Sequence, residues 1–241
     1  MGLSIADQKY LQRKKVEIVD NCPKCSIMRS PGCDCAERLR WEVEKVAAGI
    51  PLLLRELTLA NFTHPEMVQQ REVLGKILQT IATAEDPVSS LYSWVFSGPS
   101  GTGKTLGACL ILQELIKRRI RVKYLSSIKE LSDIIASSWE NRNNPEIESL
   151  KQAQVLVIDG IGTSMSSLAQ SIFSPTIAFL NEKILNGTKL IMVSALSKNE
   201  MTFPQDLQLL SLTTFHELHF AGFSYAMILE QAEAQRSNNG N

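Results

Sequence analysis

GPSGTGKT, residues 98–105, is the stretch of this 241-residue chain that decides its fold. It matches the pattern GxxxxGK[ST] and lies between an apolar segment, residues 91–97, and a segment with helical periodicity, residues 104–118. In such a loop the glycines let backbone N–H groups wrap around phosphate oxygens, and the N-terminus of the helix adds a favourable dipole. The candidate phosphate-binding residues are Gly98, Pro99, Ser100, Gly101, Thr102, Gly103, Lys104 and Thr105.

Two side chains of this loop have distinct expected roles. Lys104 is expected to reach the β and γ phosphates of ATP, and Thr105 to offer its hydroxyl to magnesium. A chance glycine-rich turn is the alternative, which the flanking strand and helix disfavour. The loop therefore predicts a nucleotide site.

A second motif lies farther along the chain, where the apolar segment 155–158 ends at Asp159. This Walker B form predicts that Asp159 holds magnesium through Thr105 and water. An acid in this place can also cap the following turn, but the loop upstream favours the magnesium role. The next residue is Gly160, where many hydrolysing relatives of such proteins carry a Glu that polarises the attacking water. Asp159 followed by Gly160 predicts a protein that binds ATP but hydrolyses it slowly.

Apolar segments alternate with amphipathic ones on both sides of these motifs. Strands are expected at residues 91–97, 122–125, 155–158 and 189–193, and helices at 36–48, 65–84, 104–118, 128–139 and 168–185. Residues 215–220 also alternate like a strand, with His216 and His219 as structural or surface residues. This order predicts an α/β protein whose parallel sheet is covered by helices on both faces.

Four of the five cysteines lie in one short segment with few core residues: Cys22, Cys25, Cys33 and Cys35. Four thiolates at this spacing can wrap a tetrahedral zinc, whose binding would supply the folding energy of the segment. Disulfides and free thiols are the alternatives, and a reducing compartment disfavours the first. Cys109, in the helix after the phosphate loop, is expected to be a small core residue.

Charge and hydropathy restrict the location and the partners. Lys plus Arg and Asp plus Glu both number 25, so any nucleic-acid surface must be local. One candidate, residues 117–123, holds five cations at a helix C-terminus, where a structural role is the alternative to contact with single-stranded DNA. No segment has the length of a signal peptide core or a membrane span. We expect a cytoplasmic protein without a membrane partner.

The order of these motifs resembles that of bacterial replicative-helicase loaders of the DnaC and DnaI kind and of the related IstB transposition ATPases. Besides the phosphate loop, the Walker B strand and the paired cysteines, the resemblance is carried by AGIP (48–51), TLANF (58–62), VSAL (193–196) and GFSY (222–225). The resemblance implies an AAA+ P-loop domain that binds ATP and Mg²⁺, at residues 50–236. It also implies a zinc-binding, partner-docking module at residues 1–49. The polar composition of residues 237–241 predicts a disordered tail.

Several positions depart from the pattern of this family. Gly160, Ala195 and Ala226 stand where the family usually has an acid, Asn and Arg, and no arginine lies between Arg142 and Arg236 to act as a finger. These departures all fall on groups that serve hydrolysis. Whether the chain acts as an enzyme is therefore left open by the sequence.

The resemblance predicts a loader that engages a hexameric replicative DNA helicase and assists its loading on single-stranded DNA, with weak or absent hydrolysis. Two alternatives stay open. One is an IstB-like transposition ATPase that binds duplex DNA, and the other is a non-hydrolysing adaptor scaffold. Single-stranded DNA and further copies of the chain are additional partners that the resemblance leaves open.

Overall fold

The computed structural model describes residues 3–20, 22, 33–62, 67–140, 144–161, 170–197, 199–200 and 215–220. Within these residues, five strands form one sheet in the order β2-β3-β4-β1-β5, and every neighbouring pair is parallel. The strands are β1 (Trp94–Ser97), β2 (Val122–Leu125), β3 (Val155–Ile161), β4 (Lys189–Ser194) and β5 (His216–His219). The predicted α/β class with a parallel sheet is confirmed.

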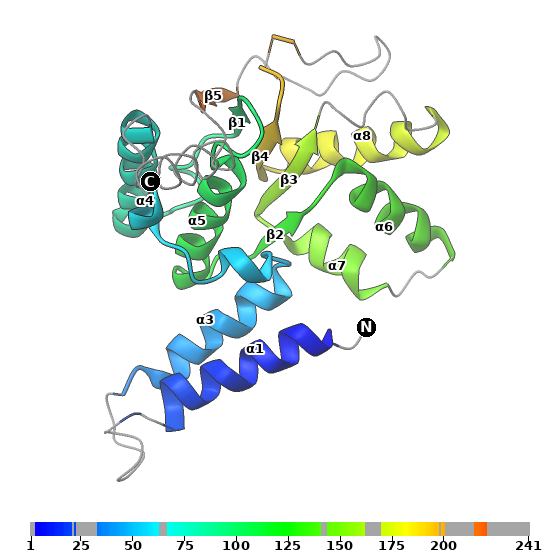
Figure 1. Ribbon diagram of the computed structural model, residues 1–241. Helices are drawn as coiled ribbons and strands as arrows, with labels where there is room; N and C mark the ends of the chain where they lie inside the picture. Colours follow the sequence, from blue (N-terminus) through cyan, green and yellow to red (C-terminus); the bar gives the residue numbers. More distant parts are fainter. Residues whose placement is uncertain are drawn as a thin grey trace, which may run out of the picture.

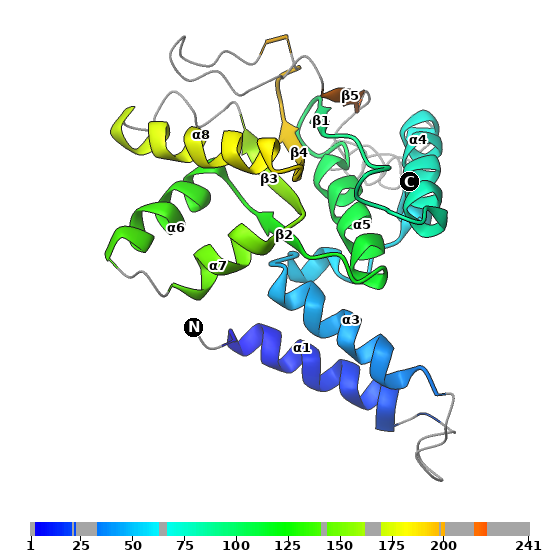
Figure 2. The same cartoon turned by 180° about the vertical axis from the view of Figure 1, so that it is seen from behind.

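Helices cover both faces of this sheet (Figures 1 and 2). One face carries α4 (Val68–Thr83) and α5 (Lys104–Lys117), and the other carries α6 (Ile128–Glu140), α7 (Pro145–Gln152) and α8 (Gln170–Leu185). Each layer has its own core, because successive strand residues point to opposite faces. Val157 packs with the α4 and α5 layer, whereas Leu156 and Ile158 pack with the other layer.

Helix α5, which follows the phosphate loop, is buried along most of its length. Its sequence is apolar on nearly all sides, and it packs against the sheet, α4 and α3 (Cys35–Ala47). A helix of this composition is stable only when it is enclosed. The N-terminus of α5, which carries Lys104 and Thr105, is therefore held on a rigid support.

The N-terminal helices lie beside each other and extend away from the sheet (Figure 1). Helix α1 (Ile5–Lys15) leads into a π-helical turn (Val16–Asp20), and α3 returns toward the sheet. Tyr10 of α1 is buried, and its hydroxyl donates to the carboxylate of Glu42 on α3. A polar contact between two otherwise charged helices thus supplements a small apolar interface.

Arg55 connects α1 to the chain that follows α3. It lies between two 3₁₀ turns, Leu52–Leu54 and Leu59–Asn61, and only 5% of the residue is exposed. Its Nε donates to the carbonyl of Ile50 at 2.7 Å, its Nη1 donates to Asp7 Oδ1 at 2.7 Å, and its guanidinium lies over the Tyr10 ring. Arg55 and Ser4 hold the pKa of Asp7 below its usual range, with the hydrogen bond from Ser4 as the larger cause.

The predicted elements are present, with boundaries that differ by a few residues. The first strand begins at Trp94 rather than at residue 91, and the helix expected at 65–84 covers Val68–Thr83. One helix, α7, was not predicted. Helix α7 has a local start signal in Asn144, whose side chain accepts from Glu146 N, followed by Pro145.

None of the helices in the described part of the chain combines the length and apolar character that a bilayer crossing needs. The tail expected at 237–241 lies outside the described residues.

We predict that Arg55→Met lowers the free energy of unfolding by roughly 2 kcal/mol, because it leaves Asp7 and the Ile50 carbonyl without a buried donor. Urea denaturation checks this value. The matched control is Arg13→Met, which removes an ion pair to Glu56 between side chains that are 62% and 44% exposed. It should cost less than about 1 kcal/mol. Equal losses in the two variants would contradict the role of Arg55.

Candidate nucleotide site

The phosphate loop runs from the end of β1 to the start of α5 and presses against the end of β5. Gly98 has a φ of +125°, and a Cβ placed there would lie 2.3 Å from the carbonyl oxygen of Phe220. Phe220 N in turn donates to the carbonyl of Ser97 at 2.8 Å. Any side chain at position 98 would therefore displace the backbone of the neighbouring segment, so only glycine fits.

Lys104 is held inside the loop by the main chain of the loop itself. Its Nζ donates to the carbonyl of Gly98 at 2.7 Å and to that of Pro99, and only 8% of the residue is exposed. Thr102 Oγ1 also donates to the Pro99 carbonyl, at 2.9 Å. Burial lowers the pKa of Lys104, and the nearby charge of Asp159 opposes this shift. The loop thus positions an ammonium group at its centre.

Asp159 lies near the end of β3 and accepts three hydrogen bonds. Its Oδ2 accepts from Thr105 Oγ1 and from the hydroxyl of Tyr124, both at 2.8 Å, and its Oδ1 accepts from Gly160 N at 2.8 Å. The structure therefore brings the predicted pair of Thr105 and Asp159 together. Burial, together with the charge of Asp159, raises the pKa of Tyr124, which keeps its hydroxyl a donor.

These groups line a cavity of about 440 Å³, a volume within the usual range for small-ligand sites. Its lining residues are Leu54, Ser100, Gly101, Gly103, Lys104, Thr105, Leu106, Asp159, Gly160, Val193, Ser194 and Ala195. Leu54 was not predicted as part of the site. It comes from the segment after α3, where its carbonyl accepts from Gln113 Nε2 of α5 at 3.0 Å. Leu54 thus adds an apolar residue to the lining of the cavity.

Two positions of the cavity wall lack the side chains that the family resemblance associates with hydrolysis. Gly160 has a φ of +68°, and the β3–β4 register shifts between Ile158 and Ile161. Ala195 is exposed beside the end of β4. The chain therefore presents neither an acid nor an amide side chain at these two positions. Residues 222–225 and Ala226 lie outside the described residues.

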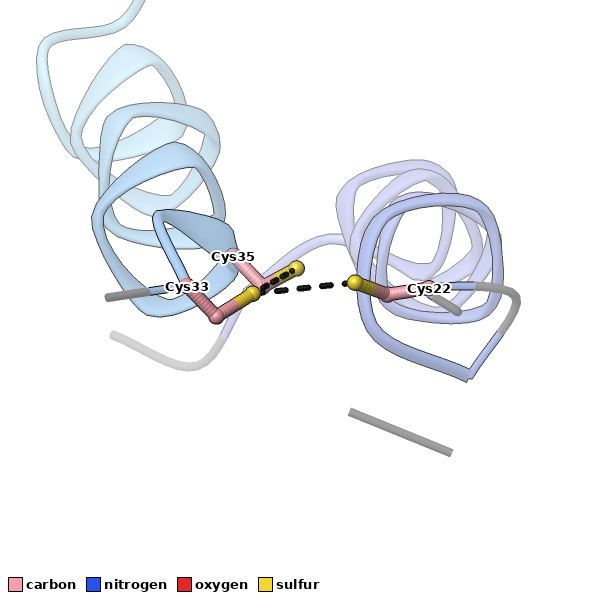
Figure 3. Close-up of side chains that lie close together, drawn as sticks. All are labelled: Cys22, Cys33 and Cys35. Carbon is pink, nitrogen blue, oxygen red and sulfur yellow. Dashed lines mark hydrogen bonds between the residues drawn. The ribbon is translucent and has the colours of Figure 1, made fainter. Parts of the chain in front are cut away.

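Three cysteines converge where the first helical segment ends and α3 begins (Figure 3). The sulfur atoms of Cys22, Cys33 and Cys35 all lie within 4.8 Å of one another. The Cys22–Cys33 sulfur distance is 3.6 Å, and the Cys33–Cys35 distance is 2.9 Å. Tetrahedral zinc with bonds of about 2.3 Å places its sulfur ligands about 3.8 Å apart. The Cys22–Cys33 distance is close to this value and the Cys33–Cys35 distance is shorter, so the cluster is compatible with zinc when the sulfur atoms of Cys33 and Cys35 move apart. Cys25, the fourth predicted ligand, lies outside the described residues.

The basic cluster of residues 117–123 is engaged within the molecule. Arg118 donates to the carbonyls of Ala82 and Ala84 at 2.6 Å and thereby caps α4. The other cations, Lys117, Arg119, Arg121 and Lys123, contact Glu114, Glu37, Gln152 and the Ala47 carbonyl, respectively. These contacts favour the structural role of the cluster.

The two histidines of β5 have structural contacts as well. The His216 ring packs on those of Tyr92 and Trp94, with centroids 4.2 and 5.2 Å away. His219 Nδ1 lies 3.1 Å from Ser97 Oγ. Neither belongs to the one group of potential metal ligands found among the described residues.

A parallel sheet of this strand order, with a P-loop between β1 and α5 and an aspartate on β3 that contacts the P-loop Thr, defines a P-loop protein of the AAA+ class. The model of one family, the IstB-like ATP binding proteins, matches residues 46–221. The chain belongs to this family. No curated protein sequence matches the chain.

Solved structures share the fold at low sequence identity. The crystal structure of the DnaC helicase loader matches with a TM-score of 0.51 and 15% identity, over 71% of this chain and 100% of that one. The DnaI crystal structure matches with a TM-score of 0.51 and 16% sequence identity, over 72% of this chain and 93% of that one. AMPPCP-bound DnaA from Aquifex aeolicus matches with 0.52 and 17%, over 75% of this chain but only 55% of that one.

We predict that Gly160→Glu lowers the free energy of unfolding by about 1–2 kcal/mol without raising ATP turnover, because φ at this position is left-handed. The nearest neighbour of a Cβ there is Ser126 O at 3.8 Å, so the cost is conformational rather than steric. Gly160→Ala should lose the same amount. Gly187→Ala is the control away from the cavity, because Gly187 also has a left-handed φ, +82°, and a Cβ placed there meets no atom within 4 Å. Denaturant unfolding and phosphate release measure both effects, and a stable Gly160→Glu protein with fast turnover would contradict them.

Proposed function

We propose that this protein is an ATP-binding helicase loader, which engages a hexameric replicative DNA helicase and assists its loading on single-stranded DNA with weak or absent hydrolysis. The main observation behind this proposal is that the buried P-loop residue Lys104 lines the same cavity as the hydrogen-bonded pair Thr105 and Asp159. Family membership and a fold shared with the DnaC loader over the full length of that chain support the same function.

Nucleotide binding uses residues 98–105 and Asp159. The backbone N–H groups of the loop and Lys104 Nζ bind the β and γ phosphates, and Leu54 faces the less polar part of the nucleotide. Thr105 and Asp159 offer hard oxygen ligands 2.8 Å apart, which suit Mg²⁺. The cation neutralises phosphate charge when it is bound.

Hydrolysis is slow because the groups that orient water and stabilise the transition state in the family pattern are missing from their usual positions. Gly160 and Ala195 present no polar side chain to the cavity, and Ala226 replaces a cation of the family pattern. An arginine finger alone is worth about 10³–10⁵ in rate, and effects of groups that act as a unit are not additive. ATP acts through its occupancy of the site.

Residues 1–49 form the partner-docking module, and zinc bound by Cys22, Cys25, Cys33 and Cys35 closes its outer end. Cys22 follows the first helical segment, and Cys35 is the first residue of α3, where the helix N-terminus favours a thiolate. The metal would fix the α1 and α3 pair at the end opposite to the Arg55 contacts (Figure 1).

We predict about one zinc per chain by elemental analysis of the purified protein. Cys33→Ser should lose the metal, because a tetrahedral site then has three thiolates at most. Cys109→Ala is the control, since Cys109 is buried in α5 and burial raises the pKa of its thiol to about 12. A chelator should melt residues 1–49 while the P-loop domain stays folded. Metal-free protein with unchanged helicity would contradict the zinc module.

The loader function is tested by mixing the protein with the replicative helicase of its source, with and without ATP. We predict a complex that forms more tightly with ATP, while phosphate release stays near background even with single-stranded DNA. Lys104→Ala should lose ATP binding in calorimetry and, with it, the ATP-dependent part of complex formation. No helicase complex under any of these conditions would overturn the proposal.

A second candidate is an IstB-like transposition ATPase that binds duplex DNA, favoured by the family match itself. It predicts length-dependent binding to duplex DNA, which the loader does not need. A non-hydrolysing adaptor scaffold would instead bind its partner equally well with Lys104→Ala. The same mixtures, with duplex DNA added, separate the three functions.

A further inference from the structure

We infer that Tyr124 is a positioning residue for the magnesium side of the nucleotide site, acting through the carboxylate of Asp159. The inference rests on the proposed nucleotide binding and adds a residue that the P-loop and Walker B motifs do not contain. Its direct basis is the hydrogen bond of 2.8 Å from the Tyr124 hydroxyl to Asp159 Oδ2.

The sheet register brings these two side chains to the same face. Tyr124 of β2 pairs with Val157 of β3, and Asp159 follows Val157 by two residues. Both Tyr124 and Val157 belong to the core under α5, whose N-terminus carries Thr105. The hydroxyl of a tyrosine at this register position reaches past Val157 to the carboxylate near the strand end.

The three donors to Asp159 restrain it in different ways. Thr105 and Tyr124 both donate to Oδ2, whereas Gly160 N donates to Oδ1. Without Tyr124, the described residues would still supply one hydroxyl and one adjacent backbone amide, and the carboxylate could rotate about its χ2 torsion, which is intrinsically broad. The Tyr124 hydroxyl therefore fixes the plane in which the carboxylate meets the metal and its water.

The position of Tyr124 is itself fixed at both edges of β2. One edge forms the parallel ladder with β3, and on the other Tyr124 N donates to the Ala48 carbonyl at 2.8 Å. The side chain is enclosed, with 6% of the residue exposed. The hydroxyl is thus presented by a rigid backbone. The same residue joins the end of α3 to the magnesium side of the site.

The test is calorimetry of ATP binding to Tyr124→Phe, in excess Mg²⁺ and again in EDTA. We expect affinity in Mg²⁺ to fall roughly 3- to 10-fold, the net effect of one ordinary hydrogen bond, because Tyr124 acts on the metal only through Asp159. Affinity in EDTA should stay at the wild-type value. A purely structural tyrosine would change both affinities or neither. Because phenylalanine keeps the ring, the apo protein should unfold near the wild-type temperature.

The matched control is Tyr10→Phe, which removes another buried hydroxyl that donates to a carboxylate, that of Glu42, away from the cavity. It should leave both affinities unchanged. Wild-type affinity of Tyr124→Phe in Mg²⁺ would overturn the inference while leaving the proposed function intact. Absence of ATP binding by the wild-type protein would overturn the proposed function and the inference together.

Discussion

The carboxylate of Asp159 is the point on which the site depends. Among the described residues it accepts hydrogen bonds from the start of α5, from the end of β2 and from the amide of Gly160, the next residue of β3. A carboxylate that accepts hydrogen bonds on both of its oxygens is held in one orientation. The parallel order of β2, β3, β4 and β1 makes this convergence possible, since it brings the carboxyl ends of all four strands to one edge.

The geometry separates what binding needs from what hydrolysis needs. Binding groups come from the backbone of a loop, an enclosed lysine and a pair of oxygen ligands, all fixed by the core beneath them. Hydrolysis groups are side chains at strand ends, where one substitution removes the function without disturbing the core. The left-handed φ of Gly160 and the register shift beside it favour glycine at this position, so an acid placed there would meet backbone strain.

The sequence predicted the parts of the structure that follow from local pattern. The sequence pattern specified β2 with the same bounds as the structure, residues 122–125, and the P-loop pattern specified both ends of its loop. The sequence could not predict contacts that depend on strand register. Tyr124 is part of the site only because β2 pairs with β3 in one of several conceivable registers. The place of Leu54 in the cavity lining could not be predicted either, because the short 3₁₀ turn after α3 has no periodic sequence pattern. Helix α1 has no apolar stripe along one face. Its position against α3 is therefore set by the contacts of Tyr10 and Arg55, which its sequence pattern does not indicate.

The segment between α3 and the sheet links the N-terminal helices to the cavity by short covalent and polar connections. Ala48 accepts from Tyr124 N, Leu54 accepts from α5 and lines the cavity, and Arg55 holds α1 through Asp7. Helix α3 has 13 residues and therefore spans about 20 Å, with the cysteine cluster at one end and this segment at the other. A tilt of the helical pair must either break the Arg55 contacts or move the segment that carries Leu54. In the proposed function, partner binding at the outer end and nucleotide occupancy of the cavity would act on the same few residues, and coupling between them would be reciprocal in free energy.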